Sequence, residues 1–406
     1  MIPLPLDELR GLGRLEGDAD EVTGVTIDSR RVTVGDLFVA VRGGVDFLDE
    51  ARARGAAATL VPDDDFAALA AIGRAARARL DAKVVAITGS VGKTSTKDIL
   101  AALLEPHANL VAAEDGFNNE LGLPLTLCSA DPDTDVLVTE MGMRGPAQIR
   151  ALAEIAQPDV GLITCIAPVH LELLGSIENI ARAKAELLEH VRIGVVPAEQ
   201  PELEPFIPPG LDVRRFSPPQ AEVRDGRAHV RWHGRDVVFG FTALHHATNA
   251  AAALTVLEAL GLEPPREPVD VVFSRWRSQE AALPGGGLLI NDAWNANPLA
   301  MRAALAHLRD RADGRRTVAV LGDMAELGRE APGYHEEVGR EAENVDVVIG
   351  VGELARGYDP DAWAPTAAEA LPLVRELVRP GDAVLVKASR SVGLEIVADA
   401  ILEDAS

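Results

Sequence analysis

A glycine-containing turn between a predicted strand and a predicted helix holds the residues whose types and spacing point most directly to chemistry. The apolar run 84–88 predicts a buried strand, and a helix is expected from Lys93 onward. Glycines let the backbone curl so that N–H groups face phosphate oxygens, and a helix N-terminus adds a positive dipole end. The sequence therefore predicts a nucleoside triphosphate site formed by Gly89, Ser90, Val91, Gly92, Lys93, Thr94 and Ser95.

Two side chains of this turn have expected roles. Lys93 can reach the outer phosphates, and the Thr94 hydroxyl can ligate Mg2+. Only two residues separate the two glycines, whereas the general phosphate loop has four. The strand-to-helix context favours a phosphate loop over the alternative, which is an ordinary turn with a surface lysine.

Two further candidate groups follow predicted strands. Glu140 comes at the end of a strand over 135–139, and His170 follows a strand over 160–166. Ligands of parallel α/β sheets bind outside the carboxyl ends of the strands. We therefore expect the phosphate turn, a carboxylate and an imidazole at one edge of one sheet. Taken singly, the two residues could also be a solvated loop acid and a hydrogen-bonded structural histidine.

Lys184 lies in the middle of a predicted helix that Ser176 caps and that extends to about residue 191. None of its neighbours one helical turn away is an acid, so no helical ion pair explains it. From spacing alone we expect its stem to lie on an apolar face while its ammonium reaches water.

Composition narrows the class of protein. The 406 residues carry a net charge of −24, which argues against nucleic acid or an anionic membrane surface as the main partner. No apolar run reaches the roughly 18 residues of a membrane span, and the N-terminus lacks the features of a signal peptide. These features predict a cytoplasmic protein without membrane insertion. Cys128 and Cys165 lie in apolar segments and are expected to be core thiols.

Alternating strand and helix patterns predict an α/β chain of three domains. Residues 1–81 are expected to form a small N-terminal α/β domain, and residues 82–273 a central doubly wound parallel sheet with the phosphate turn. Residues 274–406 are expected to form a Rossmann-like C-terminal domain. Its predicted strands also end in polar loops, at 291–298 and 387–390 among others.

Six motifs in order along the chain resemble those of the Mur ligases, the ATP-dependent amide ligases that build the peptidoglycan stem peptide. The resemblance covers nearly the whole chain and is weakest over residues 192–240. The motifs are ITGSVGKTSTK at 87–97, FNNELGLP at 117–124, TEMG at 139–142, APVHLELLGS at 167–176, NDAWNANP at 291–298 and LGDMAELG at 321–328.

The resemblance implies a reaction and its participants. ATP would activate the tripeptide carboxylate of UDP-N-acetylmuramoyl-tripeptide as an acyl phosphate, and D-alanyl-D-alanine would then attack it. Two Mg2+ ions are implied, the first held by Glu140 and the second by His170. Thr94 and a carbamylated Lys184 are implied as further oxygen ligands for Mg2+. A monomer acting in cytoplasmic peptidoglycan precursor synthesis is expected.

The resemblance also implies roles for other residues. Asn249 is expected at adenine, Asp292 at the ribose, Asn295 in the phosphate region and Arg277 at the domain junction. The expected substrate-binding residues are Asp28, Ser29 and Arg30 for the uridine nucleotide, Lys387, Ser389 and Arg390 for the dipeptide, and Asn118, Asn119 and Asn297 elsewhere in the substrate site.

Three departures from the family pattern accompany the resemblance. His246 stands where an asparagine is common, and Trp294 stands where a tyrosine is usual. The loop at 42–46 is shorter than the family's corresponding loop. This shortening leaves open a related amide ligase with another acceptor, such as a Mur paralogue or a folylpolyglutamate synthase-like enzyme. An alternative that is not an enzyme of this kind is a nucleotide-dependent switch or scaffold protein that binds ATP without ligation. The sequence has no N-K-x-D motif for reading guanine, which argues against a GTPase.

Overall fold

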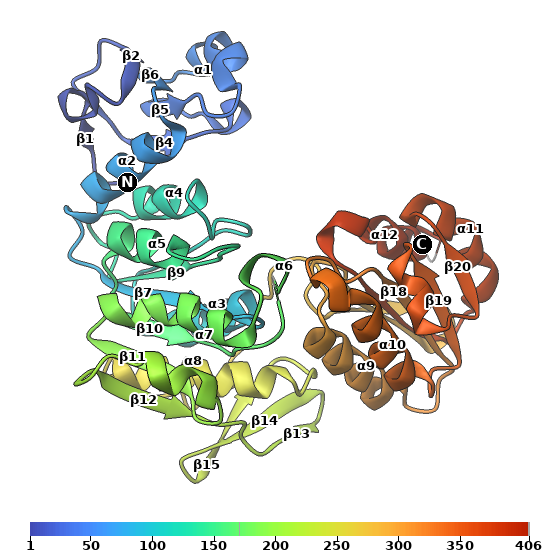
Figure 1. Ribbon diagram of the computed structural model, residues 1–406. Coiled ribbons are helices and arrows are strands. Elements are labelled where there is room, and N and C mark those ends of the chain that lie inside the picture. Colours follow the sequence, from blue (N-terminus) through green and yellow to red (C-terminus); the bar gives the residue numbers. More distant parts are fainter. Residues whose placement is uncertain (170, 405–406) are drawn as a thin grey trace.

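The computed structural model describes residues 1–169 and 171–404, and the chain folds into three α/β units (Figure 1). Each unit has its own sheet, and the first is joined to the second by α2 (Asp65–Arg77). We propose domain boundaries near residues 81 and 273, where the chain leaves one sheet for the next. Within the described part of the chain, no helix has the length and apolar character needed to cross a bilayer.

The first unit contains a four-stranded sheet and a short antiparallel ribbon. The strand order of the sheet is β2 (Gly13–Glu16), β6 (Ala58–Pro62), β5 (Asp36–Val39) and β4 (Gly24–Thr26). The ribbon pairs β1 (Leu4–Pro5) with β3 (Glu21–Val22), and the helices are α1 (Leu48–Ala53) and α2. Residues 21–26 thus form two short strands, β3 and β4, which belong to different sheets.

The middle unit contains a six-stranded parallel sheet in which β7 (Lys83–Thr88) lies between two strands that end at or before other predicted site residues. The strand order is β12 (Asp212–Phe216), β11 (Ile193–Pro197), β10 (Val160–Ile163), β7, β9 (Val136–Glu140) and β8 (Leu110–Ala112). Alternate residues of β7 face opposite layers, because Val84 packs in one core cluster and Val85 in the other. The predicted doubly wound sheet is therefore confirmed.

Helices cover both faces of this sheet, as Figure 1 shows. One face is covered by α3 (Lys93–Leu104) and α8 (His246–Ala259). The other is covered by α4 (Gly122–Ser129), α5 (Gln148–Ala156) and α7 (Ile177–Ala185). The segment 192–240, over which the resemblance to the Mur ligases is weakest, ends in an antiparallel meander of β13 (Ala221–Arg224), β14 (Arg227–Trp232) and β15 (Arg235–Phe239).

The C-terminal unit is a second six-stranded sheet with one antiparallel edge strand. Its order is β16 (Gln279–Leu283), β17 (Gly287–Asp292), β21 (Ala383–Lys387), β18 (Thr317–Gly322), β19 (Val347–Val351) and β20 (Ala362–Ala364). One face carries α9 (Pro298–Ala312) and α10 (Ala331–Ala342). The other carries α11 (Ala367–Leu377) and α12 (Glu395–Glu403).

Two predictions about the middle unit are wrong in detail. The helix predicted from Ser176 to about residue 191 is α-helical only to Ala185 and continues as a 3-10 turn. Strand β10 ends at Ile163, earlier than expected, so Cys165 falls in a loop at the sheet edge and is half-buried. Cys128, by contrast, is buried in the core as predicted.

Candidate active site

The connection from β7 to α3 forms the predicted phosphate turn, and its glycines are required by their surroundings. Gly89 and Gly92 have φ angles of 146° and 84°, in the region that other residues rarely adopt. A Cβ at Gly89 would overlap the Thr164 hydroxyl, and one at Gly92 would lie 2.5 Å from Asn249 Oδ1. The turn is therefore packed tightly against the ends of β10 and α8.

Two lysines converge on one backbone carbonyl of this turn. Lys93 Nζ donates to the Gly89 carbonyl oxygen at 2.8 Å, and Lys184 Nζ donates to the same oxygen at 2.9 Å. Burial lowers the pKa of Lys93, which Glu140 partly offsets. Burial, and then the charge of Lys93, hold the pKa of Lys184 well below its usual value.

The expectation that the Lys184 ammonium reaches water is wrong. The residue is only 2% exposed, because α7 packs against the sheet and directs this side chain under the phosphate turn. The Gly89 carbonyl oxygen lies 95 residues away in sequence, so helical spacing alone gave no sign of this partner. A buried amine of lowered pKa fits the family's carbamylated position, because the neutral amine is the form that reacts with CO2.

Glu140 accepts hydrogen bonds that link three segments of the middle unit. Thr94 Oγ1 donates to Glu140 Oε2 at 2.7 Å, and Asn118 Nδ2 donates to Glu140 Oε1 at 3.0 Å. The alternative of a solvated loop acid does not hold, because Glu140 is the buried last residue of β9. A hydroxyl and a carboxylate side by side are oxygen donors of the kind that Mg2+ prefers.

No group of three or more His, Cys, Asp or Glu side chains with metal-binding geometry occurs among residues 1–169 and 171–404. The predicted metal ligand His170 lies outside the described residues.

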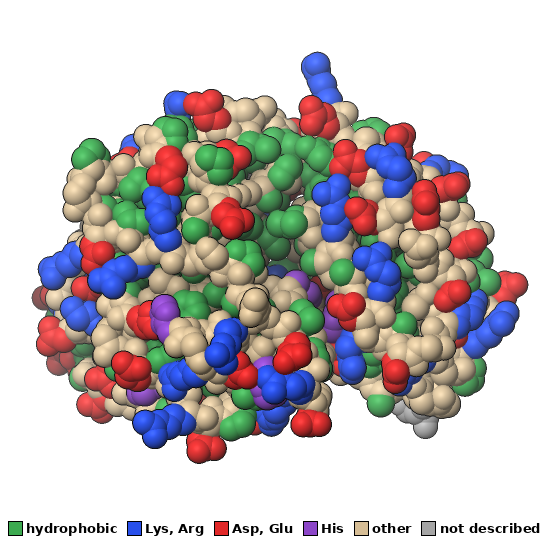
Figure 2. Space-filling model, turned by 90° about the horizontal axis from the view of Figure 1, so that it is seen from below, with side chains coloured by type: hydrophobic (Ala, Val, Ile, Leu, Met, Phe, Trp, Pro, Cys, Tyr) green, Lys and Arg blue, Asp and Glu red, His purple; other side chains and the backbone are tan. Residues whose placement is uncertain are grey.

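The phosphate turn opens into a cavity of about 380 Å3 between the middle and C-terminal units. Figure 2 shows histidine side chains in the hollow between these two lobes. Arg277 lies in the cavity wall, and its Nε is buried without a hydrogen-bond partner in the described structure. The predicted site residues that line the cavity are Ser90, Val91, Gly92, Lys93, Thr94, Ser95, Asn118, Glu140, Asn249, Arg277, Asp292, Asn295, Asn297 and Lys387.

The N-terminus of α8 forms one end of the cavity. Asn249 Nδ2 lies 3.2 Å from His246 Nδ1, and the His246 ring stacks on Phe273 with a centroid distance of 4.5 Å. Burial lowers the pKa of His245 to about 4, and its Nε2 lies 3.4 Å from the Ser278 hydroxyl oxygen. Burial also holds the pKa of His246 well below its usual value, and this ring lies beside the predicted adenine contact Asn249.

The loops of the C-terminal sheet form the opposite wall. Lys387 Nζ forms an ion pair with Asp292 and donates to the Asn295 carbonyl oxygen at 2.9 Å. The Arg277 guanidinium lies 5.4 Å from the Trp294 ring centroid. Asn297 accepts a hydrogen bond from the Ala300 N–H at 2.9 Å and caps α9, so its position is explained by the helix as well as by the cavity.

Several predicted substrate residues lie outside this cavity. Asn119 Oδ1 accepts from the N–H groups of Leu121 and Gly122 and so shapes the start of α4. The Ser389 hydroxyl accepts from the Ala325 N–H at 2.8 Å. Arg390 lies over the Trp294 ring at 5.7 Å, at the rim of the cavity.

The three residues predicted for the uridine nucleotide lie in the first unit. Arg30 forms a bidentate ion pair with Asp28, and its side-chain hydrogen bond holds the pKa of Asp28 at about 2, although burial opposes this shift. The Ser29 hydroxyl donates to Glu50 Oε2 at 3.0 Å. The structure therefore brings the nucleotide set together in one cavity and leaves these residues apart from it.

Cavity residues that the sequence did not single out include Thr164, Cys165 and Ser278. Thr164 and Cys165 follow β10, and the strand-end rule missed them because the strand was predicted to continue to residue 166. Ser278 had no such signal, because it lies in the connection between two units.

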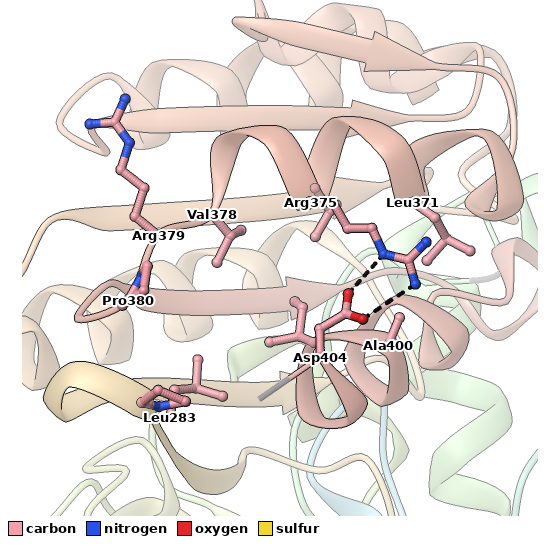
Figure 3. A pocket seen from close by; sticks show the side chains of 11 residues that line it. Leu283, Leu371, Arg375, Val378, Arg379, Pro380, Ala400 and Asp404 are labelled. Carbon is pink, nitrogen blue, oxygen red and sulfur yellow. Dashed lines mark hydrogen bonds and ion pairs between the residues drawn. The ribbon is translucent and has the colours of Figure 1, made fainter. Parts of the chain in front are cut away.

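A second hollow lies in the C-terminal unit at the amino ends of β17 and β21 (Figure 3). Its wall is mainly aliphatic, with an ion pair between Arg375 and Asp404 at 2.8 Å. None of the predicted site residues lines it. It lies at the opposite end of the strands from Asp292 and Lys387, so it is not part of the candidate site.

Comparisons with known proteins agree with this geometry. The family described as Mur ligase middle domain matches residues 87–257, and the family described as Mur ligase, glutamate ligase domain matches residues 274–390. The chain is 36% identical to the UDP-N-acetylmuramoyl-tripeptide–D-alanyl-D-alanine ligase of Mycobacterium tuberculosis, over 94% of this chain and 93% of that protein.

Solved structures give the same result. MurF from Acinetobacter baumannii superposes with a TM-score of 0.83 at 27% identity, covering 98% of this chain and 99% of that chain. The MurF ligase from Thermotoga maritima in complex with ADP superposes with a TM-score of 0.81 at 26% identity, covering 95% and 98%. Two matching domain families and a relative of this identity over nearly the full length establish that the chain belongs to the Mur ligase family.

Proposed function

We propose that this chain is an ATP-dependent ligase that joins D-alanyl-D-alanine to UDP-N-acetylmuramoyl-tripeptide through a new amide bond. The observation that carries the proposal is the cavity in which the phosphate turn of the middle unit faces Asp292 and Lys387 of the C-terminal unit. The name of the similar Mycobacterium tuberculosis protein, a UDP-N-acetylmuramoyl-tripeptide–D-alanyl-D-alanine ligase, supports the same substrates.

Three observations support ATP as the nucleotide. Residues 90–95 line the cavity at the N-terminus of α3, where backbone N–H groups and the helix dipole favour phosphate. The buried Arg277 Nε lacks a partner among the described residues, and Lys93 lies at the start of α3. The similar Thermotoga maritima ligase was solved in complex with ADP.

In the proposed reaction the terminal carboxylate of the tripeptide attacks the γ-phosphorus of ATP, and ADP leaves. Lys93 and Arg277 stabilise the negative charge of the transferring group, which is the main electrostatic task of phosphoryl transfer. The amine of D-alanyl-D-alanine then attacks the acyl phosphate carbon. Phosphate leaves and the nitrogen loses a proton, which completes the amide.

Mg2+ fits beside Thr94 and Glu140, whose oxygens would hold it, and it would neutralise phosphate charge there. Carbamylation of Lys184 would turn the buried amine beside the phosphate turn into an anionic oxygen donor. The role of His170 as a second metal ligand stays a proposal on the resemblance alone.

Other parts of the proposal concern substrates and setting. Asp28, Ser29 and Arg30 would serve the uridine nucleotide, and Lys387, Ser389 and Arg390 the dipeptide. A monomer suffices, because one chain supplies both walls of the cavity. We place the reaction in the cytoplasm, where ATP is available.

Phosphate release tests the proposed function. Purified protein is supplied with ATP, Mg2+ and UDP-N-acetylmuramoyl-tripeptide, and single amino acids and dipeptides are added in turn. We expect steady phosphate release only when D-alanyl-D-alanine is also present, together with a product larger by that dipeptide. Preferred use of another acceptor, such as glutamate, would replace this function with that of a related amide ligase, and steady ATP hydrolysis without any acceptor would contradict it.

A further inference from the structure

A buried carboxylate of α3 holds the connection between the middle and C-terminal units, residues 274–278. Asp98 lies in α3, and its two oxygens accept hydrogen bonds from the Ser274 N–H at 2.9 Å and the Ser274 hydroxyl at 3.1 Å. The Lys97 ammonium lies 2.8 Å from the same carboxylate. Because Asp98 is buried, these bonds are not exchanged freely for bonds to water.

The other end of the connection is held by the C-terminal unit. The Ser278 N–H donates to Asp292 Oδ1 at 3.1 Å, and the Trp276 N–H donates to Gln279 Oε1 at 2.9 Å. Trp276 and Ser278 have φ angles of 57° and 49°, a conformation that is uncommon for residues other than glycine and unusual for a bulky side chain. Such a conformation persists only where the surrounding structure imposes it.

Arg277 lies between these two attachments and enters the nucleotide cavity. Its Nε is buried without a partner in the described ranges of the chain, and it lines the same cavity as Lys93. The guanidinium therefore lies near Lys93 with a donor available for an anion. Where it lies depends on the backbone of residues 274–278, which Asp98 and Asp292 hold from opposite sides.

We propose that Asp98 is a positioning residue that places Arg277 for binding nucleotide phosphate. The helix α3 then aligns two phosphate-binding groups at once, because Lys93 starts it and Asp98 fixes the segment that carries Arg277. This inference rests on the proposed function, since it takes the cavity to bind ATP. Its alternative is that Asp98 only stabilises the fold by pairing with Lys97.

A double-mutant cycle on nucleotide affinity separates the two. The dissociation constant for ATP with Mg2+ is measured by calorimetry for the unmodified chain, Asp98→Ala, Arg277→Ala and the double variant. We expect Asp98→Ala to weaken ATP binding about tenfold when Arg277 is present and less than about twofold when it is absent, as for residues that act through one network. Equal losses in both backgrounds, or no loss in either, would overturn the proposal.

Two further variants complete the test. Ser274→Ala removes one of the two bonds to Asp98 without leaving Lys97 unpaired, so its cycle with Arg277 decides the question even if Asp98→Ala does not fold. We expect a smaller loss of affinity that also requires Arg277. Glu105→Ala, at the exposed far end of α3, is the matched control and should leave ATP binding unchanged. Absence of ATP binding by the unmodified chain would instead contradict the proposed function.

Discussion

At the scale of single residues, the chemistry of the site depends on burial as much as on residue type. Lys184 is a cation in sequence, yet its burial and its neighbour Lys93 favour the neutral amine. Its amine donates to the Gly89 carbonyl oxygen rather than to a carboxylate. An amine in this state can react with CO2, whereas a solvated lysine at neutral pH is almost entirely protonated.

We expect Lys184→Ala to reduce ligation about a hundredfold or more, because it removes a charged group beside the transferring phosphate. A short-chain carboxylate added to the variant should partly restore the rate by taking the place of the carbamate. The measurement is phosphate release with and without added acetate. Lys83→Ala is the matched control, since Lys83 is exposed and pairs with Asp159 at 3.3 Å. Full activity of Lys184→Ala would show that the amine has no part in the reaction.

The positions of the turn at 89–95 and of Glu140 at the end of β9 were predictable at this scale, because glycine conformation and strand ends are local properties. The phosphate and metal roles of these residues stay predictions. The sequence could not predict from spacing where the amine of Lys184 lies, since the bond to Gly89 joins residues 95 positions apart. The resemblance to the Mur ligases supplied the candidate role of this residue, and the structure supplied its burial.

At the scale of elements, the side chain that caps α9 also lines the site, whereas the cap of α7 does not. Asn297 Oδ1 accepts a hydrogen bond from the Ala300 N–H at the start of α9, and Asn297 lies in the cavity wall. The Ser176 hydroxyl accepts a hydrogen bond from the Asn179 N–H and caps α7, as the sequence predicted. A polar residue at such a position can be required for stability, for substrate, or for both.

Substitution of Asn297 distinguishes these requirements. Asn297→Ala should lower the free energy of unfolding by about 1 kcal/mol, because it removes the cap of α9, while Asn297→Ser should keep most of that stability. Urea unfolding measures the first effect, and phosphate release measures activity. Stable but inactive Asn297→Ser would support a substrate role, and a fully stable Asn297→Ala would contradict the capping role.

The long parallel strands and their helices were predictable because apolar runs and helical periodicity mark them clearly. The edge strand β16 was missed, because its sequence QEAAL has no alternation of strongly apolar residues and pairs with only one neighbour. The helix α4 was missed for a related reason. It is apolar on nearly every side, so it lacks the periodic pattern that identifies a surface helix.

At the scale of the whole molecule, the units are joined in two different ways. The first unit shares an apolar core with the middle unit, in which Leu69 and Ile72 of α2 pack with Leu125 and Cys128 of α4. The C-terminal unit meets the middle unit through polar groups, among them Glu280, which accepts a hydrogen bond from the Thr242 hydroxyl at 2.6 Å.

Glu280 makes the stability of the C-terminal unit depend on pH. Burial would raise the pKa of Glu280, but hydrogen bonds from His307, Arg311 and Thr242 outweigh it and lower the pKa to about 2. Because the folded value lies below the usual 4.5, this stabilisation is complete above pH 4.5 and is lost as the pH falls toward 2.

We therefore expect the urea midpoint of the unmodified chain to fall more between pH 5 and pH 3 than that of Glu280→Gln. Glu263→Gln is the control, because it makes the same substitution at an exposed position. The same fall for Glu280→Gln and for the unmodified chain would show that Glu280 does not contribute.

The sequence predicted three units but not which side chains meet between them. The contacts of Asp98 with Ser274 and of Thr242 with Glu280 join positions 176 and 38 residues apart, and neither follows from local pattern. A cavity between two units depends on such contacts. A binding site at the strand ends could therefore be expected from the sequence, but the residues of the C-terminal unit that face the phosphate turn could not be derived from local pattern.

The apolar core shared by α2 and α4 determines how the contact between the first two units responds to dissolved salt. Beside it, Arg31 and Glu114 form an ion pair whose side chains are 54% and 55% exposed, so dissolved salt screens their attraction. Burial of Leu69 against Leu125 is not weakened in this way, and excluded salts such as sulfate strengthen it. In concentrated sulfate the first unit should therefore remain packed against the middle unit, even though the attraction between Arg31 and Glu114 is screened.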